Sequence, residues 1–239
     1  MRLFNPFSRK GLFWCFLLTS IAAHAQLGSW NILHLRYQPS QKLTLFGEAQ
    51  LRSLAFYQQF HYYEVKGGIS WKLNDQIAVT GGVGRYDTYQ AGGNFVTPKA
   101  QQEIRSWLEI GMRNNLYQLN IDHRYRAEQR FTKNGYRNRF RYRLGLSAPL
   151  YFWGAPEKEL FASIWNEIFL TNRAPYFERN RSFLGLVLRS GAFSYSAGWV
   201  HQFDYRLTDE TGRSFLQLGC QITLGPSKKE KGAPEIEEN

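Results

Sequence analysis

Charged and apolar residues alternate between His123 and Leu144, and this alternation constrains the fold more than any other feature of the sequence. Arginine and glutamate occupy every second position on each side of Asn134-Gly135, with mainly aromatic or aliphatic residues between them. Successive side chains of a strand point to opposite faces, so a period of two indicates strands with unlike faces. Similar segments recur along most of the chain. The sequence predicts an all-β fold, an antiparallel transmembrane β-barrel of about 10–12 strands with a charged lumen.

The first 25 residues have the features of a secretory signal peptide. Three basic residues precede an apolar run over residues 12–23, and Ala23-His24-Ala25 forms an A-x-A cleavage motif. The run is shorter than the roughly 20 apolar residues that a membrane-spanning helix needs. We therefore expect a cleaved signal peptide over residues 1–25, a barrel over residues 26–224 and a flexible periplasmic tail over residues 225–239.

The strand count conflicts with the usual practice of bacterial barrels. Eleven alternating segments are present if residues 29–37 are included, whereas such barrels almost always have an even number of strands. We therefore expect ten strands if one segment is not transmembrane, or twelve if one is unrecognised. Connections near 74–76, 114–115 and 190–192 are predicted to be short and periplasmic. Those near 54–60, 89–101, 172–178 and 207–212 are longer or richer in glycine, proline and aromatic residues.

Two dipeptides that contain asparagine, Asn134-Gly135 and Asn114-Asn115, predict hairpin turns. A type I′ turn at Asn134-Gly135 places Glu128 opposite Arg141, and a similar turn at Asn114-Asn115 places Glu103 opposite Arg126. Both registers keep the charged faces of neighbouring strands on one side of the sheet, which a slip by one residue would destroy.

The charged residues of the predicted inner face form the candidate site. They are Glu48, Arg52, Glu64, Glu103, Arg105, Glu109, Arg124, Arg126, Glu128, Arg130, Arg139, Arg141 and Arg143. One interpretation is a structural polar core in which arginines and carboxylates satisfy each other. The other is an anion-selective lining or ligand site, because arginine outnumbers carboxylate. The structural interpretation is favoured because small barrels have interiors just wide enough for side chains.

Other kinds of site have little support in the sequence. The net charge is +11, or +8 once the three basic residues of the signal are removed (11 − 3). Nucleic-acid binding is not expected, because the arginines are interleaved with glutamates on strand faces and the chain is expected to be exported. The five histidines have no recurring ligand spacing, and we expect neither a metal nor another cofactor. After signal cleavage only Cys220 remains, on the same parity as neighbouring leucines, where it is expected to face lipid.

A lipid hydrolase is the enzymatic alternative. Such an enzyme needs a serine, a histidine and an orienting polar residue close together at the lipid-facing surface. His123 and His201 share the aromatic parity of their segments, but no serine lies within two positions of His123, and Ser196 has the opposite parity to His201. We therefore expect the protein to be non-enzymatic.

Six motifs together resemble one family of Gram-negative outer-membrane proteins, catalogued as domain of unknown function 2490. They are Glu48-x-Gln50-Leu51-Arg52, Glu103-x-Arg105, Arg124-x-Arg126-x-Glu128-Gln129-Arg130-Phe131, Arg139-x-Arg141-x-Arg143-Leu144, Asn166-Glu167 and Asn180-Arg181. The resemblance implies an outer-membrane β-barrel and brings no known activity or catalytic residues. The chain departs from common barrel practice because a tail follows the last predicted strand, which ends near Leu224.

These observations define the functional expectations. The protein is expected in the outer membrane of a Gram-negative bacterium, exported through the general secretory route and inserted by the barrel-assembly machinery. Its expected partners are outer-membrane lipid and small anionic solutes. The first hypothesis is a structural or interaction barrel with an Arg/Glu-filled lumen. The alternatives are a narrow, porin-like passage that prefers anions and an outer-membrane lipid hydrolase.

Overall fold

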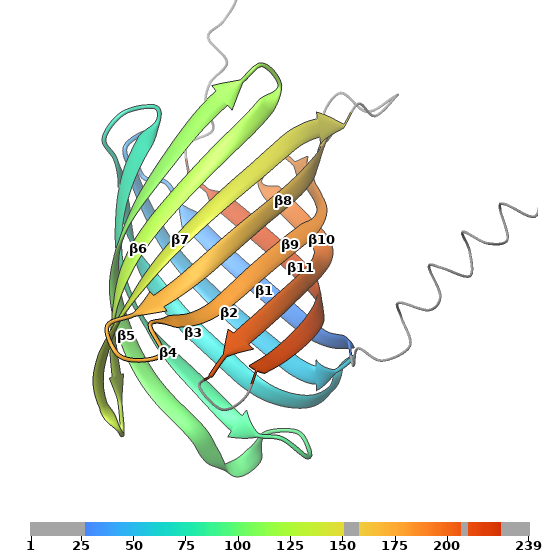
Figure 1. The fold of residues 1–239 in the computed structure, drawn as a ribbon. Coiled ribbons are helices and arrows are strands. Elements are labelled where there is room, and N and C mark those ends of the chain that lie inside the picture. Colours follow the sequence, from blue (N-terminus) through green and yellow to red (C-terminus); the bar gives the residue numbers. More distant parts are fainter. Residues whose placement is uncertain (1–26, 151–157, 207–209, 226–239) are drawn as a thin grey trace, which may run out of the picture.

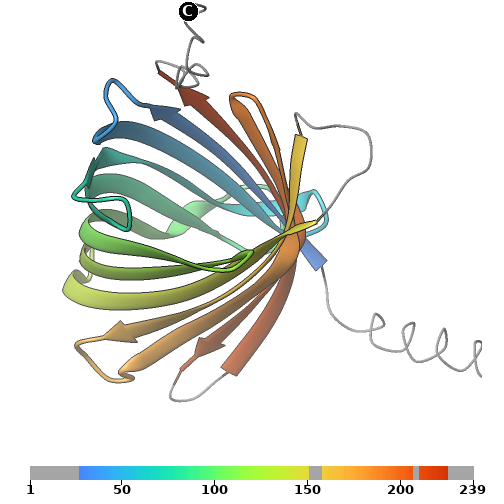
Figure 2. The same ribbon diagram turned by 90° about the horizontal axis from the view of Figure 1, so that it is seen from above.

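The computed structural model describes residues 27–150, 158–206 and 210–225, in which eleven strands form one closed barrel (Figures 1 and 2). The strands are β1 (Leu27–Tyr37), β2 (Leu43–Ala55), β3 (Gln58–Lys72), β4 (Ile77–Gln90), β5 (Val96–Leu116), β6 (Leu119–Thr132), β7 (Gly135–Leu150), β8 (Lys158–Thr171), β9 (Phe177–Ser190), β10 (Phe193–Tyr205) and β11 (Glu210–Leu224). Within these ranges no helix is long and apolar enough to span a bilayer. The predicted signal peptide, and the predicted tail after Gly225, lie outside the described residues.

The barrel closes through one parallel pair of strands. All other neighbours are antiparallel, whereas β1 and β11 run side by side from Leu27 opposite Ser214 to Tyr37 opposite Leu224. An odd number of alternating strands leaves the first and last pointing the same way, so the seam must be parallel. The expectation of an even number is therefore wrong. Residues 29–37 do form a strand, and the parallel seam accommodates it.

The two ends of the barrel are named here by the strand ends that they contain. The N-rim, at the bottom of Figure 1, contains the start of β1 and the connections 56–57, 91–95, 133–134 and 172–176. The C-rim, at the top, contains the end of β11 and the connections 38–42, 73–76, 117–118 and 191–192. The connection near 54–60 is aromatic but short, because only Phe56 and Tyr57 separate β2 from β3. Both rims combine short and longer connections.

The period-two alternation produces an apolar outer face and a polar inner face, as predicted. Outward side chains such as Leu108, Leu184 and Val65 are 68%, 59% and 57% exposed. Cys220 also points outward, into a shallow apolar groove that it shares with Leu33 and other residues of β1, β2 and β11. Exposed apolar side chains on this scale are unusual for a protein surrounded by water.

The inner face is apolar where β9, β10, β11 and β1 meet. Trp30, Phe183, Val200 and Phe215 form a buried cluster there. Gly185 and Gly198 lie directly opposite each other on β9 and β10, and a Cβ atom on either would come within 2.6 Å of the Phe183 ring. These glycines make room for the ring, so their small size supports the packing of this wall.

Candidate functional site

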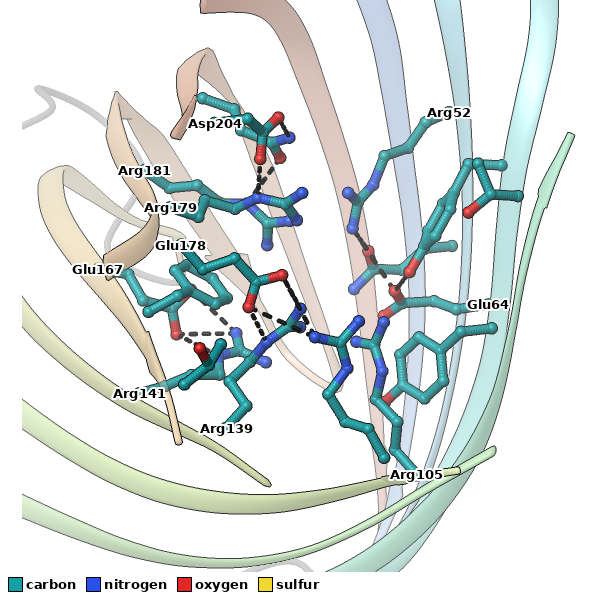
Figure 3. Close-up of a pocket in the computed structure, with 18 of the residues that line it drawn as sticks. Arg52, Glu64, Arg105, Arg139, Arg141, Glu167, Glu178, Arg179, Arg181 and Asp204 are labelled. Carbon is teal, nitrogen blue, oxygen red and sulfur yellow. Dashed lines mark hydrogen bonds and ion pairs between the residues drawn. The ribbon is translucent and has the colours of Figure 1, made fainter. Parts of the chain in front are cut away.

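All thirteen residues of the predicted charged site lie on the inward faces of β2, β3, β5, β6 and β7. Figure 3 shows charged side chains from opposite walls converging inside the barrel. The face of each residue was predicted correctly because strand parity alone decides it. We call these thirteen residues the lumen network.

Glu128 is the most enclosed carboxylate of the lumen network, with no exposed side-chain surface. Arg141 donates a hydrogen bond to it from Nη1 at 2.6 Å. Arg139 and Arg126 lie at ion-pair distances of 3.6 and 3.7 Å. Three guanidinium groups therefore depend on one buried carboxylate, an arrangement that stabilises a charged core only while every member stays in place.

Glu103 and Glu109 bind the next arginines along the same wall. Glu103 accepts hydrogen bonds from Arg105 at 2.6 Å and from Nη2 of Arg130 at 3.1 Å. Glu109 forms ion pairs with Arg126 at 2.5 Å and with Arg124 at 3.7 Å. The contacts of Arg130 and Arg126 connect β5 to β6 through charge-assisted hydrogen bonds, which are stronger than neutral ones.

A smaller group of charges occupies the wall formed by β2 and β3. Lys66, which was not predicted as a member of the site, lies 2.6 Å from both Glu48 and Glu64. Glu64 also pairs with Arg52 at 3.5 Å. Lys66 therefore forms ion pairs with two carboxylates. Glu64 is shared between two cations, Lys66 and Arg52.

The predicted register of the β6–β7 hairpin is wrong by two residues. Glu128 lies opposite Arg139 rather than Arg141, because Lys133 and Asn134 form the turn. A type I′ turn needs a positive φ at both central residues. In this connection only Gly135 has one, at 103°, so the glycine follows the turn instead of occupying its centre.

The predicted register of the β5–β6 hairpin is also wrong. Strand β5 continues to Leu116, the connection falls at residues 117–118, and Glu103 lies opposite Thr132 instead of Arg126. Both errors shift the pairing by an even number of residues, which leaves every side chain on its predicted face. The faces were therefore predicted correctly even though the partners were not.

Five charged residues of β8, β9 and β10 were missed by the prediction: Glu167, Glu178, Arg179, Arg181 and Asp204. The β8–β9 register shifts between Phe169 and Leu170, so Glu178 and Arg179 both reach the cavity although they are consecutive. A period-two pattern cannot reveal such a bulge. Glu167 had a parity signal, but its inward neighbours are aromatic, which hid the polar face.

Aromatic rings underlie many of the guanidinium groups. The buried Phe169 ring has four of them within 5.7 Å of its centre, from Arg139, Arg141, Arg179 and Arg181. Arg52 lies 3.5 Å above the Trp30 ring. Arg143 lies 5.5 Å from the Trp165 ring and forms no ion pair with a carboxylate of the described residues. Cation–π contacts of this kind lower the cost of holding guanidinium groups away from water.

The network leaves a cavity of about 600 Å³ inside the barrel. Its described lining includes fifteen cationic side chains, fourteen of them arginines, and only five carboxylates. Glu103, Glu109 and Glu128 lie outside this lining, so the surface that faces the cavity is more positive than the network as a whole. A concave wall with one sign of charge attracts counter-ions.

The cavity extends to the N-rim. Its lining includes residues 173–175 together with Arg206 and Arg213, which lie at or near that rim. None of the described connections of the C-rim contributes to the lining. The geometry is that of a charged chamber on the N-rim side of the barrel.

Two histidines occupy the outer face, as their parity predicted. Nδ1 of His123 lies 2.9 Å from the Tyr142 hydroxyl, and Nδ1 of His201 lies 3.1 Å from Oγ of Ser214. Ser214 belongs to β11, so sequence proximity to His201 could not reveal this pair. A catalytic histidine is normally oriented by an acidic group, and no carboxylate of the described residues hydrogen-bonds to His201.

Comparison with known proteins gives one match. No curated protein and no solved structure matches the chain. The model of the family described as "Protein of unknown function (DUF2490)" matches residues 27–213, which include β1 to β10 and the start of β11. The chain therefore belongs to this family of unknown function, in agreement with the resemblance carried by its charged strand motifs.

Proposed function

We propose that this protein is a non-enzymatic outer-membrane β-barrel whose lumen receives small anionic solutes. The exposed apolar outer face and the signal-like first 25 residues support the membrane location. The observation that carries the solute class is the lining of the cavity, where fifteen cationic groups face five carboxylates. The buried carboxylates behind them stabilise the barrel, so structural core and anion chamber are two layers of one network.

The proposed topology follows from the assignment of the C-terminal tail. If residues 225–239 lie in the periplasm, the C-rim faces the periplasm and the chamber opens outward at the N-rim. Solutes would then meet Arg173 and Arg213 first. A chamber on one side favours binding over free passage. An anion-preferring passage is the related alternative, and it requires a continuous path to the C-rim.

Charged thiol reagents test the anion preference directly. Thr211→Cys in a Cys220→Ser background places a thiol on the cavity wall, and Asp75→Cys places one in the exposed 73–76 connection as the control. We expect the ratio of modification rates, anionic over cationic methanethiosulfonate, to be at least about tenfold higher at position 211 than at position 75. Equal ratios at the two positions would refute the proposal.

Planar-bilayer recording separates chamber from passage. A closed chamber predicts no stable conductance steps from protein that is shown to be inserted. Steps with a reversal potential that indicates anion preference would support the passage instead, and cation preference would contradict both.

The His201–Ser214 pair supports a lipid hydrolase as a second candidate. Its test is fatty-acid release from phospholipid vesicles by the refolded protein. Activity that Ser214→Ala abolishes would establish the hydrolase, and absence of release would leave the pair as a structural hydrogen bond.

A further inference from the structure

Arg181 differs from the other buried arginines of the cavity in its hydrogen bonding. Arg181 is 7% exposed and lines the cavity. Nε donates to Oε1 of Gln202 at 2.8 Å, and no carboxylate of the described residues lies within ion-pair distance. A buried guanidinium group without a paired counter-ion is costly, and among the described residues the only hydrogen-bond acceptor of this one is a neutral amide.

Two aromatic rings bring further guanidinium groups close to Arg181. Its guanidinium carbon lies 5.0 Å from the centre of the Trp30 ring, which also carries Arg52 at 3.5 Å. It lies 4.8 Å from the centre of the Phe169 ring, which also carries Arg179 at 5.7 Å. Figure 3 shows Arg181 and Arg179 together on one wall and Arg52 on the facing wall.

The carboxylates available to these three arginines do not balance them. Arg179 pairs with Asp204. Arg52 lies 3.5 Å from Glu64, which is also bound by Lys66 at 2.6 Å. Arg181 has no carboxylate of the described residues within ion-pair distance, because Glu167, which lies opposite it across β8 and β9, binds Arg124 and Arg141 instead. The group therefore retains an excess positive charge that faces the cavity.

The rings beneath these arginines restrict the kind of ligand. Trp30 is 4% exposed and Phe169 is 1% exposed. Guanidinium groups lie over both rings, and Trp30 also packs against Phe215. Beside Trp30 and Phe169 the cavity therefore presents the planar guanidinium groups of the arginines and little apolar surface. Guanidinium forks bind phosphate and carboxylate groups through paired hydrogen bonds, whereas an acyl chain would find little to contact. The volume of about 600 Å³ is ample for a compact molecule.

We propose that Arg181, together with Arg52 and Arg179, forms the binding site for a compact polyanion that carries phosphate or carboxylate groups. The inference rests on the proposed anion chamber and names the place and chemistry of binding within it. The ligand enters from the N-rim and supplies the negative charge that Arg181 lacks.

Calorimetric titration of the refolded mature chain tests this site, with pyrophosphate and citrate as the two probes. Arg181→Gln should weaken binding of the preferred probe by about tenfold or more, the loss expected for one charged hydrogen-bonding partner. Arg181→Lys keeps the charge without the paired donors of the guanidinium group and should give an intermediate loss.

Arg189→Gln is the matched control, because Arg189 shares the strand and inward parity but does not line the cavity. Its affinity should stay within about twofold of the unmodified chain. Stronger binding of pyrophosphate assigns a phosphate ligand, and stronger binding of citrate a carboxylate ligand.

The outcomes separate this inference from the function on which it rests. If Arg181→Gln and Arg189→Gln bind the probes equally well, the site lies elsewhere and the inference is wrong, while the anion chamber survives. If the unmodified chain binds neither probe but still shows the anionic preference at position 211, the polyanion site is again wrong. If that preference is missing too, the chamber itself is refuted. Folding serves as an internal check, because removing an unpaired buried charge should leave the unfolding midpoint of Arg181→Gln equal to or above that of the unmodified chain.

Discussion

Replacement of Glu128 by leucine tests whether the lumen network stabilises the barrel. The change removes the carboxylate that Arg141, Arg139 and Arg126 share. It keeps a side chain of similar volume, so the cost of creating a cavity is small. The destabilisation then comes mainly from positive charge left buried with less compensation.

The magnitude follows from the partners that remain. Arg141 keeps Glu167 at 2.8 Å, Arg126 keeps Glu109 at 2.5 Å and Arg139 keeps Glu178. Breaking a buried ion pair costs about 3–5 kcal/mol. Because each arginine retains one carboxylate, we expect the lower end, about 3 kcal/mol.

Urea titration of the refolded protein in lipid vesicles measures this effect. With a denaturant slope of about 3 kcal/mol per molar, the midpoint should fall by about 1 M. The control is Glu159→Leu, which removes a carboxylate that is 63% exposed and lies 3.7 Å from Arg189. That exposed pair should contribute about 0–1 kcal/mol. Glu128→Gln, which keeps an acceptor but loses the charge, should fall between the two. Midpoints for Glu128→Leu and Glu159→Leu within about 0.3 M of each other would refute a stabilising charged core.

Two further substitutions test the fold. Leu33→Cys should form a disulfide with Cys220, which lies directly opposite it across the parallel seam; Leu35→Cys, two positions along, should not, and the reverse result on a non-reducing gel would contradict the parallel closure. Gly198→Val should prevent formation of the heat-resistant barrel on a gel, because its side chain would meet the backbone oxygen of Leu184 and the Phe183 ring at 2.5–2.6 Å. Gly47→Val should be tolerated, since no atom lies within 4 Å of a Cβ there, and equal loss in both would disprove the packing explanation.

The sequence predicted the features that depend on parity. Strand faces, the charged lumen and the outward position of Cys220 all follow from the period of two, and the structure agrees with each. Hairpin partners were predicted less well, because a turn signal marks where the chain reverses without deciding which residues occupy the turn. Gly135 follows its turn, and Asn114-Asn115 lies inside β5.

The residues in and around the proposed polyanion site were the hardest to predict. Glu178 reaches the cavity through a bulge, and Arg181 hydrogen-bonds to the amide of Gln202 instead of a carboxylate, which depends on three-dimensional contacts. The cavity itself also depends on how far long side chains extend across the lumen. None of these properties has a periodic signature in the sequence.

The parallel seam determines how this chain could be cut and rejoined. Leu27 begins β1 at one rim and Leu224 ends β11 at the other, ten residues farther along the register, so about 33 Å of barrel wall separates them at about 3.3 Å per residue. A circular permutant that joins Leu224 to Leu27 therefore needs a connection as long as the barrel wall, whereas a barrel with antiparallel closure needs only a short loop. Addition of one strand at either end of the chain would make every neighbour antiparallel and bring the ends to the same rim. A twelve-stranded version of this barrel would therefore be expected to tolerate circular permutation with only a short connecting loop.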